Sequence, residues 1–155
     1  MSKDPTCEQR IDEHLQDRLD DLKALRSIAQ GMRSTPAEMV ARAEDLGLEP
    51  NLPWNEAEEA AQELLDNYPL WIGANSYEQD DELCLLVQLS TGGPGDEFRL
   101  YPSADRSRVA RIVYRFIDWW DCAERTLTDP DDVAAVTDTW GEYMVSMLDE
   151  PPADY

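Results

Sequence analysis

The sequence predicts an α+β protein in which N-terminal helices precede a four-stranded antiparallel meander, and a C-terminal helix ends the chain. One change of pattern along the chain indicates this class. Up to about residue 66 the apolar residues recur every three or four positions, as on a helix face, and from Pro69 they fall in short segments between turn-rich stretches. A chain of 155 residues is also the size of one domain, so we expect a single domain over residues 1–155.

The helical part is expected at about residues 5–66 and to contain three helices. The first two are expected to end at Gly31 and Gly47, and the third at about Asp66. Each helix follows residues that are typical of a helix N-terminus. These are Asp4 with Pro5, Thr35 with Pro36 and Glu38, and Asn55 with Glu58.

The sheet part is expected at about residues 69–120, with antiparallel strands as the simplest arrangement. The fourth strand also fits a helix, because Val109, Ile112, Val113 and Phe116 have helical spacing; we favour a strand, since apolar residues also alternate with Arg111 and Arg115. The expected strands are residues 70–72, 83–89, 97–101 and 109–118.

A final helix is expected at about residues 130–148. Thr128, Asp129 and Pro130 together form a typical helix start, with proline in the first turn. Pro151 and Pro152 are expected to lie beyond its end.

The composition is strongly acidic. Asp and Glu number 34 and Lys and Arg 13, which gives a formal net charge of -21. Nucleic acid is therefore a poor direct partner, because its binding depends on Lys and Arg displacing counterions, and an anionic membrane surface would repel the chain. A basic protein surface is the complementary partner.

The cysteines and the apolar pattern indicate in which cellular compartment we expect the protein. Cys7, Cys84 and Cys122 are odd in number and lack CxxC spacing, and residues 1–30 lack the apolar core of a signal peptide. No apolar run reaches the roughly 18–20 residues that a membrane helix requires. We therefore expect a cytoplasmic protein with reduced thiols.

Residues 89–101, LSTGGPGDEFRLY, resemble a phosphate-binding loop in their glycine content. A phosphate loop needs a Lys or a following helix, whereas here Asp96 and Glu97 follow and then alternating strand residues. The stretch is better interpreted as a hairpin turn between two strands, in which Gly92, Gly93 and Gly95 supply conformational freedom.

Three stretches resemble small uncharacterised proteins of phages and other mobile elements. They are the LSTGGP run, residues 98–101 and residues 114–119. The resemblance covers residues 83–120, and the chain departs from it at residues 120–122, where a Gly-containing turn is expected. It implies a mobile-element origin and interference with host systems as the class of function. It supplies no catalytic motif.

Catalytic and metal sites are not indicated. His14 is the single histidine and is expected to be an ordinary helix residue, and no cysteine cluster or nucleophile–base pair is present. The acidic runs at residues 80–82 and 129–132 do not match a calcium loop. We expect no cofactor and no enzyme activity. We expect core positions for one aromatic set, with a partner-facing hot spot as the alternative. The set consists of Trp119, Trp120, Trp140 and Tyr143.

Acidic residues at helical spacing are the candidate partner-binding residues. On the third helix they form one stripe opposite the alanines and leucines, about 5–6 Å apart along the axis, the scale of neighbouring phosphates. The final helix repeats the pattern, and Asp149 would extend it. The candidates are Glu56, Glu59, Glu63 and Asp66 on the third helix, Asp80, Asp81 and Glu82 in a loop, and Asp131, Asp138 and Glu142 on the last helix.

These features lead to two hypotheses. The first is a nucleic-acid mimic from a mobile element that blocks the basic groove of a host CRISPR effector or restriction enzyme. The alternative is an acidic adaptor or structural protein of a halophilic or high-GC organism, with an interface in the Trp-rich segment 116–143; Lys3 and Lys23 are its only lysines. Either a monomer or a homodimer fits.

Overall fold

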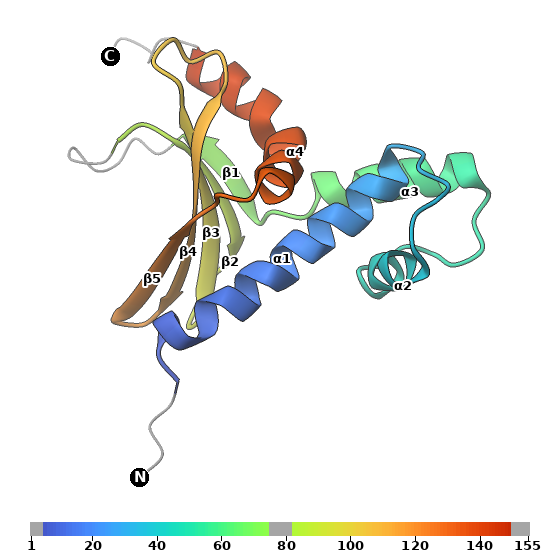
Figure 1. Ribbon diagram of the computed structural model, residues 1–155, viewed down its shortest axis with the longest axis horizontal. Coiled ribbons are helices and arrows are strands. Elements are labelled where there is room, and N and C mark those ends of the chain that lie inside the picture. The colour runs from blue at the N-terminus through green and yellow to red at the C-terminus, as the bar shows by residue number, and fades with distance from the viewer. Residues whose placement is uncertain (1–4, 75–81, 150–155) are drawn as a thin grey trace. The chain divides into compact units, whose positions relative to one another are not determined.

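The computed structural model describes residues 5–74 and 82–149 (Figure 1). The chain forms two compact units, one made of residues 1–14 and 69–155 and the other of residues 15–68. The α+β class is confirmed, with a five-stranded antiparallel sheet in place of the four strands predicted. The elements are α1 (Cys7–Ala29), α2 (Ala37–Asp45), α3 (Trp54–Asp66), β1 (Trp71–Ala74), β2 (Leu85–Ser90), β3 (Gly95–Pro102), β4 (Val109–Asp118), β5 (Asp121–Thr126) and α4 (Pro130–Asp149).

The sheet of the first unit is a meander in the order β1-β2-β3-β4-β5. Residues 109–118 form β4, so strand was the correct choice there over helix. The fifth strand was missed because its sequence shows no apolar alternation. Only one of its six side chains, that of Ala123, is buried. Pairing with β4 makes β5 a strand: Val113 lies opposite Thr126 and Phe116 opposite Ala123.

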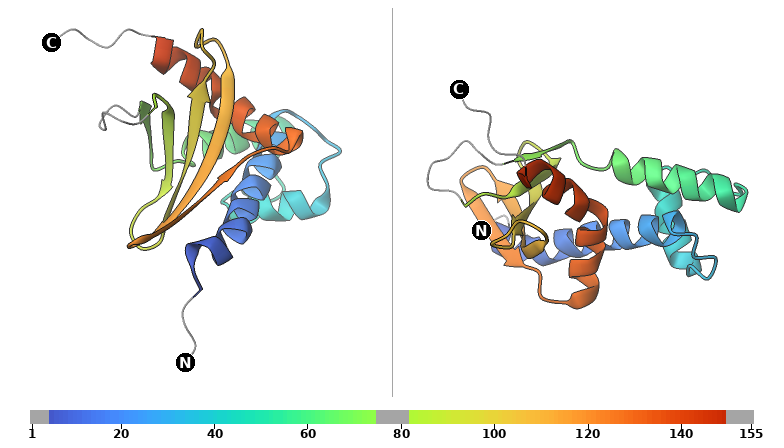
Figure 2. Two further views of the ribbon diagram at one scale, coloured as in Figure 1. Left: turned by 60° about the vertical axis from the view of Figure 1, so that its left-hand side comes forward. Right: turned by 90° about the horizontal axis from the view of Figure 1, so that it is seen from above.

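Alternation along the strands places one set of large side chains on one face of the sheet. Phe98 of β3 lies opposite Tyr114 of β4, and their ring centroids are 5.2 Å apart. Trp140 of α4 packs on the same face, 5.8 Å from the Phe98 ring, and Figure 2 shows α4 lying across the sheet. The buried members of this face include Val87, Phe98, Leu100, Ile112, Tyr114 and Phe116.

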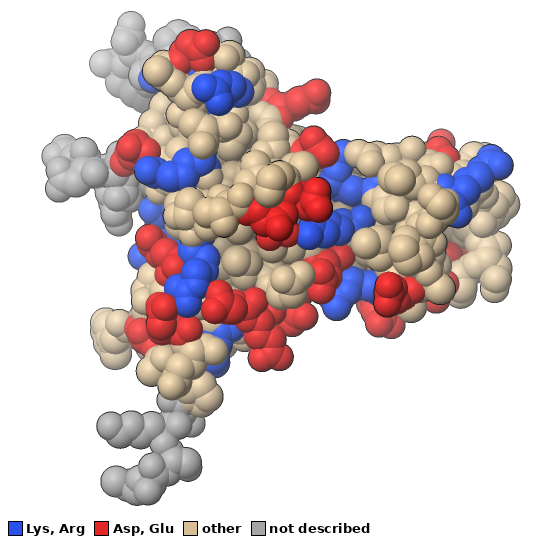
Figure 3. All heavy atoms as spheres, in the orientation of Figure 1, with Lys and Arg blue, Asp and Glu red and all other residues tan. Residues whose placement is uncertain are grey.

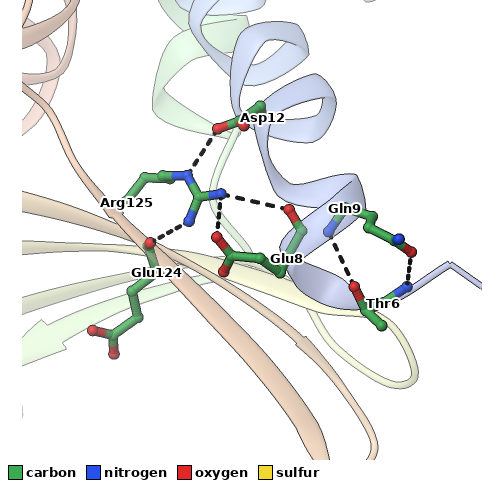
Figure 4. Close-up of polar contacts among 6 residues, drawn as sticks. All are labelled: Thr6, Glu8, Gln9, Asp12, Glu124 and Arg125. Atoms are coloured by element: carbon green, nitrogen blue, oxygen red, sulfur yellow. Dashed lines mark hydrogen bonds and ion pairs between the residues drawn. The ribbon is translucent and has the colours of Figure 1, made fainter.

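The first turns of α1 belong to the same unit and start with a capping box. Thr6 Oγ1 accepts a hydrogen bond from the Gln9 amide at 3.2 Å, and Gln9 Oε1 accepts one from the Thr6 amide at 2.9 Å (Figure 4). This arrangement satisfies two backbone donors that a helix start otherwise leaves free. The predicted start used Asp4 and Pro5; Thr6 takes the capping role, and Asp4 lies outside the described residues.

The other predicted helix starts had mixed outcomes. Asp129 caps α4 as expected, because its Oδ1 accepts from the amide of Asp131 at 2.8 Å. The predicted capping box at Thr35 was wrong: the Thr35 hydroxyl donates to the carbonyl of Met32, and Pro36 stands at the N-cap of α2 without a side-chain cap. Asn55 likewise lies inside α3, which begins after Pro53.

The second unit holds the rest of α1 together with α2 and α3. Gly31 and Gly47 follow α1 and α2 with φ of 75° and 117°, values that glycine adopts at low cost, which confirms them as helix ends. Arg42 of α2 bonds Asp21 of α1 at 2.9 Å, and the Tyr68 hydroxyl donates to Asp21 at 2.7 Å. Burial raises the pKa of Tyr68 above its ordinary value.

Among the described residues, every helix is too short or too polar to cross a lipid bilayer.

The β3–β4 turn contains a carboxylate with a low pKa. The side-chain hydroxyls of Ser107 and Ser103 both donate to Asp105, and these bonds lower the Asp105 pKa to about 2. The ionised carboxylate therefore stabilises the turn above its ordinary pKa of about 4, and this contribution is lost as the pH falls through about 2. We expect a carbon-detected NMR titration of Asp105 to have its midpoint near 2, and Ser107→Ala to raise it. A wild-type midpoint near 4 would contradict this turn geometry.

Candidate partner-binding site

The predicted acidic stripe of α3 lies on the exposed side of that helix. Glu56, Glu59, Glu63 and Asp66 are all exposed, whereas the residues on the opposite side are buried. The helix forms because its alanines and leucines recur at helical spacing, and the same spacing aligns the carboxylates. The structure thus brings these predicted residues together on one face. The buried residues of α3 are Ala57, Ala61 and Leu65.

The charge of this stripe is not compensated within the described part of the chain. Arg42 and Arg99 are consecutive basic residues in the sequence, so α3 carries no Lys or Arg. The described residues include no basic partner of Glu59 or Glu63, and Asp66 accepts only a neutral hydrogen bond, from the Gln62 amide at 3.0 Å. The helix therefore presents carboxylates to solvent without counter-charges of its own.

Several arginines of the first unit are engaged in ion pairs. Arg115 lies 3.1 Å from Glu124, and Arg125 lies 2.7 Å from Glu8 and 2.9 Å from Asp12. Figure 3 shows basic and acidic side chains adjoining over these strands and the first turns of α1. These ion pairs neutralise acids within the first unit itself.

The remaining predicted acids fall into three cases. Asp131, Asp138 and Glu142 lie on the exposed side of α4, opposite the buried residues Trp140 and Met144. Glu82 is exposed but its carboxylate is paired with Arg111 at 2.8 Å, so its charge is largely compensated. The third case comprises residues beyond the described part, Asp80, Asp81 and the side chain of Asp149.

The aromatic set does not form one core cluster. Trp140 is buried, as predicted, but Tyr143 is 55% exposed and Trp119 and Trp120 are 79% and 99% exposed. The prediction of core positions was therefore wrong for three of the four. Trp119 and Trp120 form the two-residue connection between β4 and β5, where Asp118 pairs with Asp121, and a tight turn projects its side chains away from the sheet.

The Gly-rich stretch is confirmed as the turn between β2 and β3. Gly92 has a φ of 104°, and a side chain on Gly95 would come within 3.1 Å of the Ser90 carbonyl. The Ser90 hydroxyl donates to the buried Asp96 carboxyl, which holds the two strands across the turn. The glycines of this stretch are thus accounted for by the geometry of the hairpin.

The three cysteines differ in their surroundings: two are buried, and Cys122 is exposed and accepts a hydrogen bond from Arg115 Nε at 3.3 Å. Cys7 and Cys84 are buried, and burial with the nearby Asp121 charge raises the pKa of the Cys7 thiol. His14 stacks on Phe116 with centroids 4.4 Å apart. No cluster of His, Cys, Asp and Glu suited to a metal ion occurs in residues 5–74 and 82–149.

Comparisons with known proteins found no match, whether against protein-family models, curated proteins or solved structures. The function is therefore inferred from the residues of the chain itself.

Proposed function

We propose that the protein is an acidic nucleic-acid mimic whose α3 carboxylates occupy the basic groove of a protein that handles DNA or RNA. The exposed, uncompensated stripe of Glu56, Glu59, Glu63 and Asp66 supports this function best. At spacings of three and four residues these carboxylates lie about 4.5–6 Å apart along the helix axis, and they form a row of negative charges like the phosphates of one strand. A groove lined with Lys and Arg would bind them as it binds a nucleic-acid backbone.

The proposed mechanism is competition and requires no chemical step. A net charge of -21 accelerates encounter with a basic groove by electrostatic steering. The bound helix then excludes the nucleic acid from the groove. Because charge supplies the attraction, affinity falls as salt concentration rises.

The resemblance of residues 83–120 to mobile-element proteins gives the target class in this proposal. A mobile element gains from blocking the host enzymes that destroy foreign DNA. We therefore propose a restriction enzyme or a CRISPR effector of the host as the target. The site of action is then the host cytoplasm.

The test is a double charge reversal on α3, Glu59→Lys with Glu63→Lys. Restriction enzymes and CRISPR effectors are assayed for DNA cleavage with increasing amounts of wild-type protein or variant. We expect the wild type to inhibit a member of this panel and the reversal to weaken inhibition by about tenfold or more, since each reversal replaces an attraction with a repulsion. Circular dichroism should be unchanged because both side chains are exposed.

The matched control is Glu44→Lys with Asp45→Lys, which makes the same change in net charge at exposed positions of α2. It should retain most of the inhibition. Equal losses in both variants would show that overall charge matters and the stripe does not. Inhibition that stays constant from low to high salt would contradict mimicry.

The adaptor alternative predicts an opposite response to salt. A halophilic fold gains stability in molar salt, whereas the mimic is expected to be folded in dilute buffer and to lose only its binding. Thermal unfolding at about 0.1 M and 2 M salt distinguishes the two. The low lysine content is the sequence feature that this alternative explains.

A further inference from the structure

Two adjacent tryptophans form the exposed tip of the β4–β5 hairpin. Trp120 is 99% exposed and Trp119 is 79% exposed, so neither contributes an indole to the core of its unit. Single exposed apolar side chains are ordinary on a protein surface, but two neighbouring exposed indoles form a contiguous apolar patch. The tip is therefore a candidate contact surface within the first unit.

The backbone of the tip is unfavourable for the residue that occupies it. Trp119 has a φ of 56°, in the left-handed region that glycine adopts at low cost and bulky residues rarely adopt. A glycine would close the same turn with less strain. Neither the core nor the turn explains the presence of tryptophan at this position.

The indole of Trp119 is held in place by the neighbouring hairpin. It lies over Gly93 of the β2–β3 turn, where an added Cβ would be 2.7 Å from Nε1 of the indole. Only glycine at position 93 leaves room for the ring. The two turns together thus position the indole of Trp119 in advance of any contact.

Both flanks of the tip are also fixed. Asp118 forms an ion pair with Arg10, and Asp121 Oδ2 accepts a hydrogen bond from the Cys7 amide at 2.7 Å. That amide bond lowers the pKa of Asp121. Arg10 neutralises Asp118, whereas Asp121, held by a backbone amide, keeps its negative charge next to Trp120 in the chain.

We infer that the Trp119–Trp120 tip binds arginine side chains of a basic protein partner. Guanidinium groups stack on indole faces and pair with carboxylates, and the tip offers both features side by side. The net charge of -21 disfavours an anionic bilayer and a second copy of the chain, and favours a cationic partner. This inference takes its basic partner from the proposed function and adds a second anchor, separate from the α3 stripe.

The test uses fluorescein-labelled nona-arginine and nona-lysine peptides, which carry equal charge, at about 0.15 M salt. Fluorescence anisotropy measures their affinities for the wild type and for Trp119→Gly with Trp120→Ser. We expect the wild type to prefer nona-arginine. The double variant should bind nona-arginine about 5- to 30-fold more weakly and lose the preference, as expected for two lost cation–π contacts.

Two controls separate binding from folding. Glycine suits the φ of position 119, so the melting temperature of the double variant should match or exceed that of the wild type. Tyr143→Ser removes another exposed aromatic residue, on α4, and should leave both affinities unchanged. Wild-type affinity for nona-arginine in the tryptophan variant would overturn the inference.

Failure of this inference and failure of mimicry give different results. The α3 reversal should weaken both peptides alike, through charge. The α3 reversal could leave both affinities unchanged while the tryptophan variant still binds nona-arginine more weakly. That result would support the tryptophan tip as an arginine-binding surface and contradict mimicry through α3. Two other results would overturn the inference. The wild type could bind phosphatidylcholine vesicles, or dimerise in sedimentation velocity, while the tryptophan variant does neither. In those cases a bilayer or a second copy is the occupant.

Discussion

Replacing Trp140 by alanine is expected to destabilise the protein by about 3–5 kcal/mol. The side chain is 3% exposed and packs 5.8 Å from the Phe98 ring, between α4 and the sheet. Alanine would remove this contact and leave a cavity that the surrounding rings cannot fill without leaving their rotamers. Urea unfolding, monitored by near-UV circular dichroism, measures the change in unfolding free energy.

Tyr143→Ala is the matched control for this experiment. Tyr143 lies on the same helix and is also aromatic, but it is 55% exposed. Its replacement should cost about 1 kcal/mol or less, because little buried surface is lost. If the two variants lost similar free energies of unfolding, the packing of α4 against the sheet would not depend on Trp140.

Tyr114→Phe is expected to have the second largest effect on stability, about 1–3 kcal/mol. The Tyr114 hydroxyl donates to Asp96 Oδ2 at 2.6 Å, and the Asp96 side chain is only 4% exposed. Phenylalanine retains the ring but removes this donor from a buried carboxyl. Denaturant unfolding should show a lower midpoint with an unchanged dependence on denaturant.

The role of this hydrogen bond can be isolated with a double-mutant cycle. As a control outside the cycle, Tyr143→Phe removes the hydroxyl of an exposed tyrosine and should change the free energy of unfolding very little. Combining Tyr114→Phe with Asp96→Leu should cost less than the sum of the two single changes, since no buried carboxyl then remains without its donor. Additive costs would show that the Tyr114 hydroxyl does not stabilise the fold through Asp96.

The sequence allowed prediction of those elements whose burial leaves a periodic pattern. α3 and its exposed carboxylates could be predicted because a helix with one apolar side must expose the other. β4 could be predicted because Ile112, Tyr114 and Phe116 alternate. β5 could not, since it is an edge strand whose only buried side chain is Ala123 and whose partner is fixed by the hairpin.

The tip of the β4–β5 hairpin was missed for a different reason. Tryptophan usually lies in cores, so Trp119 and Trp120 were assigned there on residue type alone. The position of a tight turn depends on the pairing of Asp118 with Asp121, which no local pattern indicates. The start of α1 was missed although its signal was present, because Thr6 and Gln9 have the spacing of a capping box.

The bonds between the first turns of α1 and β5 have a consequence for the order of folding. Arg125 and Asp12 are 113 residues apart in the chain, and Cys7 and Asp121 are 114 apart. Contacts of such high sequence separation close large loops and slow folding. During synthesis the first turns of α1 leave the ribosome long before β5 exists. The first turns of α1 therefore cannot form their bonds to β5 until nearly the whole sheet has been translated.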